Sequence, residues 1–108
     1  MERYEIINTL LAIEVRLASS GNAEEAERVE TIRKEVTRYL DGFSNVVATA
    51  TTTRSLQKQY FKARKAGQSY DATKLLNQSK DAEQILDNVI KFWTDELSAQ
   101  PPVQGTLF

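Results

Sequence analysis

Residues 43–53 read FSNVVATATTT, and the conformation of this stretch decides the fold class. Valine and threonine favour strands by propensity, so a strand here would make the chain a mixed α/β protein. The rest of the sequence offers no second strand signal, and a single strand would leave its backbone N–H and C=O groups unpaired. We therefore predict that a helix begins between residues 44 and 52 and continues to about Ala66.

Two further helices are predicted on the N-terminal side of this stretch. The first covers residues 2–19, where apolar residues recur every three or four positions, as in an amphipathic helix. These residues are Ile6, Leu10, Ile13 and Leu17. The second covers residues 23–41, with Asn22 and Glu25 forming a capping box at its start and Gly42 as its stop. Its apolar stripe is Val29, Ile32, Val36 and Leu40.

One more helix is predicted on the C-terminal side. Gly67 ends the preceding helix, and Ser69 or Asp71 caps the next one, which continues to about Leu97. Its inward-facing stripe is Leu75, Ser79, Ala82, Leu86, Val89 and Trp93, widened by Ile85 and Ile90. Pro101 and Pro102 then prevent any continuation of the helix.

These elements predict an all-α fold, a small antiparallel bundle of about four helices. The bundle covers residues 1–98, and residues 99–108 form a flexible C-terminal tail. Four helices of this size bury only a modest core, so we expect the chain to form a homo-oligomer. A self-sufficient monomeric bundle is the alternative.

The composition excludes several classes of site. The chain has no cysteine and no histidine, which removes disulfides, thiolate metal sites, the cysteine nucleophile and the usual general base at neutral pH. The phosphate-binding and nucleophile motifs GxGxxG, GxxxxGK[ST] and GxSxG are absent from the sequence. We therefore expect a protein that is not an enzyme and that uses no metal or cofactor.

The N-terminus and the hydropathy pattern bear on localisation. The first ten residues carry two glutamates and one arginine, unlike a signal peptide. No apolar run approaches the ~20 residues that a membrane span requires. We expect a cytoplasmic protein that does not bind membranes.

Charge is distributed unevenly along the chain. The net charge is −1. Residues 1–41 and residues 71–108 each carry −3, whereas residues 42–70 carry five basic side chains and no acidic one. A cationic segment therefore lies between two acidic ones.

Four of these five cations are predicted to share one face of a helix. Arg54, Lys58, Lys62 and Lys65 fall within an arc of about 80°, with Leu56, Tyr60 and Ala63 on the opposite, inward side. Phe61 projects close to the cations, where its ring is placed to stack on a base while the cations meet phosphates. Three interpretations remain open: ion pairs with the acidic helices inside the bundle or between subunits, a nucleotide or nucleic-acid site at Arg54, Lys58, Phe61, Lys62 and Lys65, or a protein partner.

The stretch RSLQKQYFKAR at residues 54–64, together with Lys80, Glu83 and Asp87 in the following helix, resembles a recurrent motif of small α-helical phage and prophage proteins. Those proteins share an arginine, then QK, then YF, then a basic residue and an arginine, followed by a helix with a lysine, a glutamate and an aspartate. The resemblance covers roughly residues 50–90 and implies a phage or mobile-element origin.

The last five residues, QGTLF, resemble the pentapeptide that binds the bacterial sliding clamp. The resemblance implies that Gln104 hydrogen-bonds at the rim of the clamp's site while Leu107 and Phe108 fill an apolar pocket. The alternative is a frayed tail, or a tail that folds back over the bundle. Gly105 departs from the leucine that is commoner at the second position.

Three functions follow from these observations as hypotheses. The first is a non-enzymatic accessory protein that modulates DNA metabolism while docked on a sliding clamp. The second is an oligomer that sequesters a nucleotide signal of host defence through its basic helix. The third is a structural helical module that binds only protein.

Overall fold

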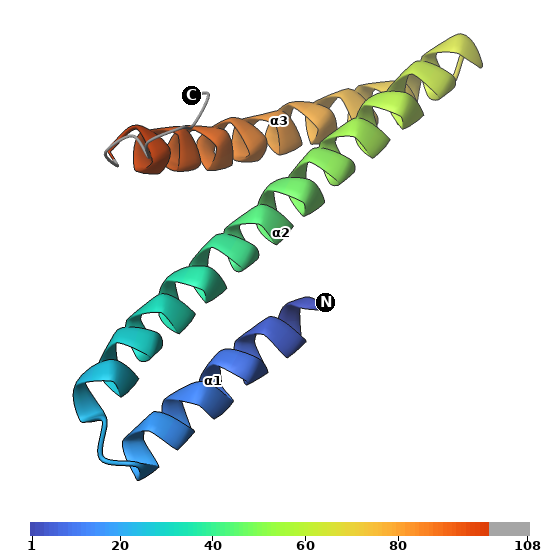
Figure 1. Cartoon of the computed structure of the whole chain (residues 1–108). Helices are drawn as coiled ribbons and strands as arrows, with labels where there is room; N and C mark the ends of the chain where they lie inside the picture. The colour runs from blue at the N-terminus through green and yellow to red at the C-terminus, as the bar shows by residue number, and fades with distance from the viewer. Residues whose placement is uncertain (100–108) are drawn as a thin grey trace. The chain divides into compact units, whose positions relative to one another are not determined.

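The computed structural model describes residues 1–99 and contains three helices in that range: α1 (Arg3–Ser19), α2 (Ala23–Lys65) and α3 (Ser69–Ser98). The chain divides into two compact units at residue 44. Unit 1 pairs α1 with the first part of α2, and unit 2 pairs the rest of α2 with α3, each as a helical hairpin (Figure 1). No strand occurs among the described residues, so the all-α prediction is confirmed at this level.

The prediction of four helices is wrong, because the second and third predicted helices are one continuous helix of 43 residues. Gly42 does not stop it, but lies buried within α2 in a helical conformation. A helical glycine costs about 1 kcal/mol relative to alanine, which the uninterrupted hydrogen-bond ladder of α2 outweighs. None of the described helices is both long and apolar enough to cross a bilayer.

The threonine-rich stretch is helical, and the hydroxyl groups of three of its four threonines have partners inside the helix. Thr49, Thr51 and Thr53 each donate to the carbonyl oxygen four residues earlier, at 2.9, 2.7 and 2.8 Å. This bond satisfies the hydroxyl without leaving the helical conformation. The β-propensity of the segment therefore does not decide its structure.

Each hairpin turn contains a glycine in the left-handed conformation. Gly21 and Gly67 have φ angles of +82° and +74°, in the left-handed region that glycine enters without strain. The residue after each glycine donates its N–H back into the ending helix, from Asn22 to Leu17 at 2.9 Å and from Gln68 to Ala63 at 3.0 Å. Gly67 thus ends its helix as predicted.

Of the predicted starts of α2 and α3, one agrees with the structure and one does not. The residue that caps α3 is Gln68, which makes no side-chain capping bond, so the assignment of the cap to Ser69 or Asp71 is wrong. Helix α2 begins directly after Asn22, as expected. The Glu25 carboxylate pairs with Arg28 at 2.9 Å, on its own helix.

In unit 1, the side chains between α1 and α2 are mostly half-buried. Its only buried side chain of hydrophobic type is Ala26, and the predicted stripe of α1 is half-buried throughout. The prediction that Ile32 belongs to the inward-facing apolar stripe of α2 is wrong, because this side chain is 53% exposed. Arg33 takes an inward position instead, and its Nη2 donates to Glu14 Oε1 of α1 at 3.2 Å. A second ion pair, Arg3–Asp41 at 3.2 Å, also joins the two helices.

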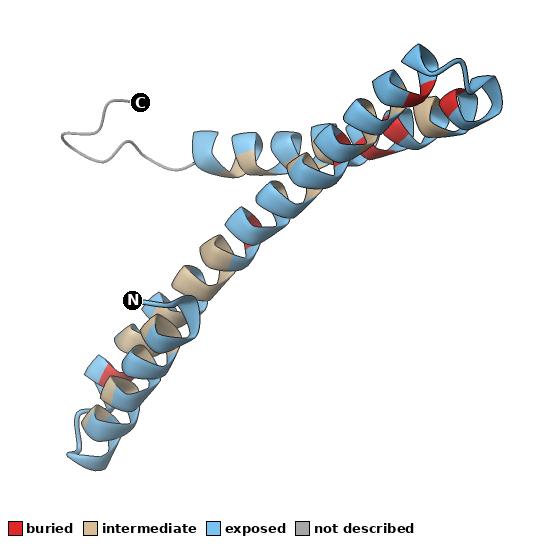
Figure 2. Ribbon diagram, turned by 90° about the vertical axis from the view of Figure 1, so that its right-hand side faces the viewer, coloured by how far each residue is buried: buried red, intermediate tan, exposed pale blue. Residues whose placement is uncertain are grey.

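Unit 2 is held by small side chains at a close helix crossing. Figure 2 shows buried positions gathered where α2 and α3 run side by side near their turn. These positions are Thr53 and Ala63 on α2 and Ala72, Ser79 and Ala82 on α3. The short side chain of Thr53 reaches the Ala82 carbonyl oxygen at 3.3 Å, which requires the two backbones to lie close together.

Candidate functional site

The cations of the basic segment lie on the outer side of α2 in unit 2. We call Arg54, Lys58, Lys62 and Lys65 the basic face; all four are exposed. Ala63 is buried and Leu56 and Tyr60 are half-buried, as predicted for the opposite side of the helix. The packing against α3 therefore turns the basic face outward, away from the other helix of its own unit.

Pairing distinguishes these cations from most others in the chain. Six of the nine Lys and Arg side chains outside residues 42–70 have a carboxylate oxygen within 4 Å, as in the pairs Arg3–Asp41 and Lys91–Asp95. None of the five inside that segment has an ion pair within the described part of the chain. Arg54 donates only to the neutral Gln57 oxygen, at 3.3 Å. The interpretation in which carboxylates of the same hairpin neutralise the basic face is therefore wrong for the described residues of unit 2, whereas pairing with another subunit stays a prediction.

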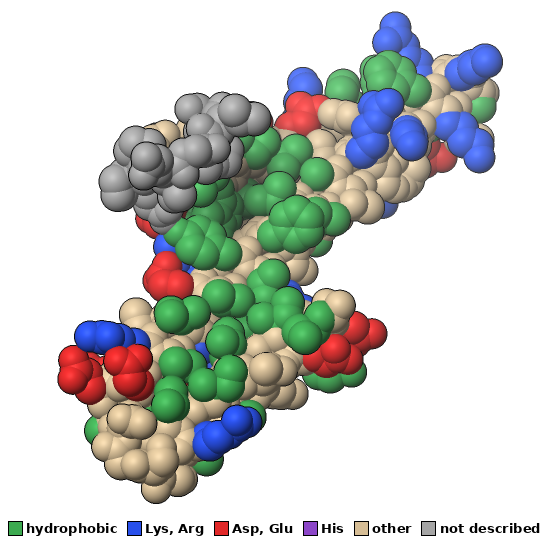
Figure 3. Space-filling view, viewed as in Figure 1, with side chains coloured by type: hydrophobic (Ala, Val, Ile, Leu, Met, Phe, Trp, Pro, Cys, Tyr) green, Lys and Arg blue, Asp and Glu red, His purple; other side chains and the backbone are tan. Residues whose placement is uncertain are grey.

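Figure 3 shows Lys and Arg side chains gathered over the end of unit 2 that carries the α2–α3 turn. On the helical projection, Phe61 lies about 20° from Arg54, directly beside the basic face. It is 59% exposed and its ring centroid is 5.2 Å from that of the half-buried Tyr60. The ring is thus accessible from solvent while one neighbour supports it.

Two open hollows adjoin the basic face, and neither is an enclosed pocket. One is lined by α2 alone, between Arg54, Lys58 and their neighbours Ala50, Thr51, Ser55 and Gln59. The other lies between the helices near the turn and brings together Lys62, Lys74 and Asp71. A small molecule is normally held by a concave pocket that buries most of its surface. The basic face presents an extended cationic surface instead.

Lys74 is the residue that the sequence patterns missed. It lies on α3, yet it lines the same hollow as Lys62. Around a tight helical hairpin, residues equally far from the turn lie opposite each other, and Lys62 and Lys74 are each six residues from Gln68. The position of the glycine turn could therefore have indicated it. Arg64, the remaining cation of the segment, is exposed but lies about 80° from Arg54 on the helix.

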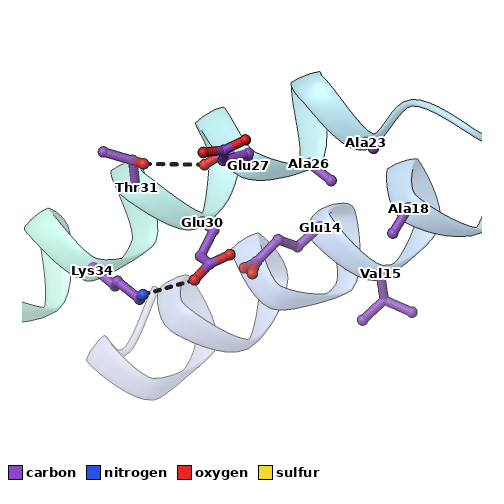
Figure 4. Close-up of a pocket in the computed structure, with 9 residues that line it drawn as sticks. All are labelled: Glu14, Val15, Ala18, Ala23, Ala26, Glu27, Glu30, Thr31 and Lys34. Carbon is purple, nitrogen blue, oxygen red and sulfur yellow. Dashed lines mark hydrogen bonds and ion pairs between the residues drawn. The ribbon is translucent and has the colours of Figure 1, made fainter.

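A hollow between α1 and α2 of unit 1 is lined by several glutamates, and it offers no cationic surface comparable to the basic face. Glu14 from α1 and Glu30 from α2 both project between the helices (Figure 4). Both carboxylates already have cationic partners, Arg33 for Glu14 and Lys34, at 2.7 Å, for Glu30. The hydrogen bond from Lys34 holds the pKa of Glu30 below its usual value, and the hydrogen bond to Glu14 raises the pKa of Arg33. Of these two ion pairs, Arg33–Glu14 joins α1 to α2, whereas Lys34–Glu30 lies along α2 alone.

The residues predicted to contact the clamp, Gln104, Leu107 and Phe108, lie outside the described residues, so this prediction stays open. Within residues 1–99, no group of three or more acidic side chains is placed to bind a metal ion. No family model, no curated protein and no solved structure matches this chain.

Proposed function

We propose that this chain is a non-enzymatic accessory protein that binds single-stranded nucleic acid through the basic face of α2. The observation that carries the proposal is the set of five exposed cations that have no ion pair among the described residues, where most other cations are paired. Exposed unpaired cations release counterions from a polyanion when they meet its phosphates, which favours binding.

The dimensions of the basic face favour a polymer over a free nucleotide. From Arg54 to Lys65 the helix rises about 16 Å. That length corresponds to about five phosphates along one strand at duplex spacing. The hollow next to Arg54 and Lys58 is lined by one helix only, so it lacks the opposing wall that would enclose a single nucleotide.

Phe61 is the feature that favours a single strand over a duplex. An exposed ring among cations can stack on an unpaired base, a contact worth about 1–3 kcal/mol, whereas the bases of a duplex are already stacked on each other. The acidic remainder of the chain repels the same polyanion, which restricts binding to this face.

The test is fluorescence anisotropy with a labelled single-stranded oligonucleotide at several salt concentrations. Four phosphate contacts predict a slope of log K against log [salt] of about −2.8. The variant Lys58→Glu/Lys62→Glu should lose binding with its helical circular dichroism intact. Its matched control, Arg16→Glu/Lys80→Glu, makes the same change in net charge at exposed cations elsewhere and should keep most of the affinity.

Phe61→Leu separates stacking from charge in the same assay. It should weaken binding of the single strand by about tenfold or more and leave any duplex binding nearly unchanged. Equal loss in the two double variants, or no binding by the wild-type chain at low salt, would contradict the proposal. Binding of an acidic protein but of no oligonucleotide would assign the basic face to a protein partner.

Docking on a sliding clamp through Gln104–Phe108 is a second candidate, supported by the QGTLF sequence and by the end of α3 at Ser98, ahead of Pro101 and Pro102. Burial of two apolar side chains against the ordering cost of five residues predicts micromolar affinity. Titration of a purified clamp with the full chain and with a chain truncated after Val103 tests it. Equal binding of the two chains would exclude this candidate.

A further inference from the structure

A second surface of unit 2 is apolar and lies on the side of the hairpin rather than on its basic outer side. We call it the lateral face, and it consists of Ala48, Thr49 and Thr52 on α2 and Ala82, Ile85, Val89 and Phe92 on α3. The four α3 residues follow the i, i+3, i+7, i+10 spacing of one helix face. Ile85 and Phe92 are 55% and 52% exposed, so unit 2 alone does not cover them.

The lateral face contains both a groove and a projecting side chain. The groove has a volume of about 170 Å³ and is lined by Ala48, Thr49, Thr52, Ala82 and Ile85. That volume is close to the roughly 150 Å³ that holds a benzene-sized apolar group. Ile85 forms one wall of the groove and extends beyond it into solvent. The groove can thus take a side chain of the size that projects beside it.

From this geometry we infer that the lateral face is the contact between two copies of this chain. A two-fold axis requires a self-complementary surface. If a residue of one copy binds a groove of the other, the same residue of the second copy must bind the same groove of the first. A groove next to Ile85 meets that condition, since each Ile85 can enter the groove of the other copy. Two hairpins joined in this way form a four-helix arrangement, which buries apolar faces that a single hairpin leaves exposed.

Charge favours a second copy over a different partner. The seven residues of the lateral face carry no charged side chain. Near a two-fold axis every charge meets its own like charge, so a surface for self-association avoids charge there, whereas a contact with another protein is commonly selected by complementary charges. The centre of the lateral face also lies about 130° around α2 from the centre of the basic face, so pairing of copies leaves the cations accessible.

This inference is independent of nucleic-acid binding, and its test is the mass of the full chain by sedimentation equilibrium from micromolar to submillimolar concentration. The wild-type chain should be a dimer. Ile85→Asp should weaken the dimer by more than about tenfold, because it places a carboxylate in each apolar groove. The matched control, Phe61→Asp, changes an equally exposed apolar residue outside the lateral face and should remain a dimer.

A second variant covers the case in which Ile85→Asp does not fold. Thr52→Trp fills the groove with an apolar ring and should give a folded monomer by circular dichroism. A monomeric wild-type chain at every concentration would overturn the inference, as would an Ile85→Asp dimer as tight as the wild type. If only a chain truncated after Ala99 forms the dimer, residues 100–108 occupy the lateral face in the full chain, and the inference is likewise overturned.

Discussion

The two hairpins of this chain use charge in opposite ways. In unit 1, ion pairs connect the helices directly, through Arg33–Glu14 and Arg3–Asp41. In unit 2, small side chains make the contact between the helices, and the basic face of α2 is exposed with no ion pair to any residue up to position 99. Charged side chains that form ion pairs between the two helices of a hairpin stabilise it. Charged side chains that the packing leaves unpaired remain available to bind a ligand. The difference is why we assign the candidate site to unit 2.

The buried Ser79 tests whether small side chains hold unit 2. Ser79 is 3% exposed where α2 and α3 pack together, and its hydroxyl oxygen has no hydrogen-bond partner among the residues that the structure describes. Ser79→Leu should lower the free energy of unfolding by about 2–3 kcal/mol, because the larger side chain separates the two helices. Urea unfolding followed by far-UV circular dichroism measures this change.

The control for that variant is Ser79→Ala, which should act in the opposite direction. It removes an unpaired buried hydroxyl and adds a better helix former, so we expect stabilisation of about 1 kcal/mol. Destabilisation by Ser79→Ala would mean that the hydroxyl group has a partner. Tolerance of Ser79→Leu would mean that the helix crossing is not close.

The ion pair between Arg33 and Glu14 tests whether charge holds unit 1. The two side chains are 23% and 13% exposed, so removal of the cation leaves a largely buried carboxylate without its partner. Arg33→Met should cost about 1–2 kcal/mol of unfolding free energy, below the loss for a fully buried pair because some solvent contact remains. Urea unfolding again provides the measurement.

Arg28→Met is the matched control for that variant. Arg28 pairs with Glu24 and Glu25 on its own helix and is 65% exposed, so its loss should cost less than about 0.5 kcal/mol. Similar losses for Arg33→Met and Arg28→Met would remove the distinction between an ion pair that joins two helices and one along a helix surface. The double variant Glu14→Gln/Arg33→Met should recover part of the loss.

The smallest expected effect is a pH dependence at Glu30 in unit 1. The hydrogen bond from Lys34 lowers the pKa of this carboxyl group in the folded chain. Folding is therefore favoured above the ordinary pKa of glutamate, and this contribution is lost as the pH falls through the lowered folded value. The melting temperature of Glu30→Gln should decrease less between pH 7 and pH 3 than that of the wild type. A parallel decrease in the two chains would show that the ion pair contributes nothing.

The two glycines at positions 42 and 67 show why local sequence rules gave one wrong helix end. The chain has a glycine after a helical stretch at position 42 and again at position 67, and local rules predict a stop at each. Only Gly67 has a positive φ, whereas Gly42 continues α2. Continuing a helix through a glycine costs about 1 kcal/mol relative to alanine, and burial of Gly42 in a long helix can offset this free energy. Sequence periodicity does not indicate whether a glycine will be buried in this way.

The sequence by itself determined what depends on neighbours along the chain. Helical periodicity placed the basic face and Phe61 on one side of a helix, opposite Leu56, Tyr60 and Ala63. The left-handed turn at Gly67 likewise depends on one residue that can adopt it.

The tertiary structure decided what depends on the register between helices. That register buries Thr53, turns Arg33 inward and leaves Ile85, which periodicity assigned to the inward stripe, 55% exposed beside an open groove. It also brings Lys74 to the hollow of Lys62. The physical reason is that burial and pairing across two helices depend on which residues lie opposite each other, and no local preference of either helix fixes that alignment.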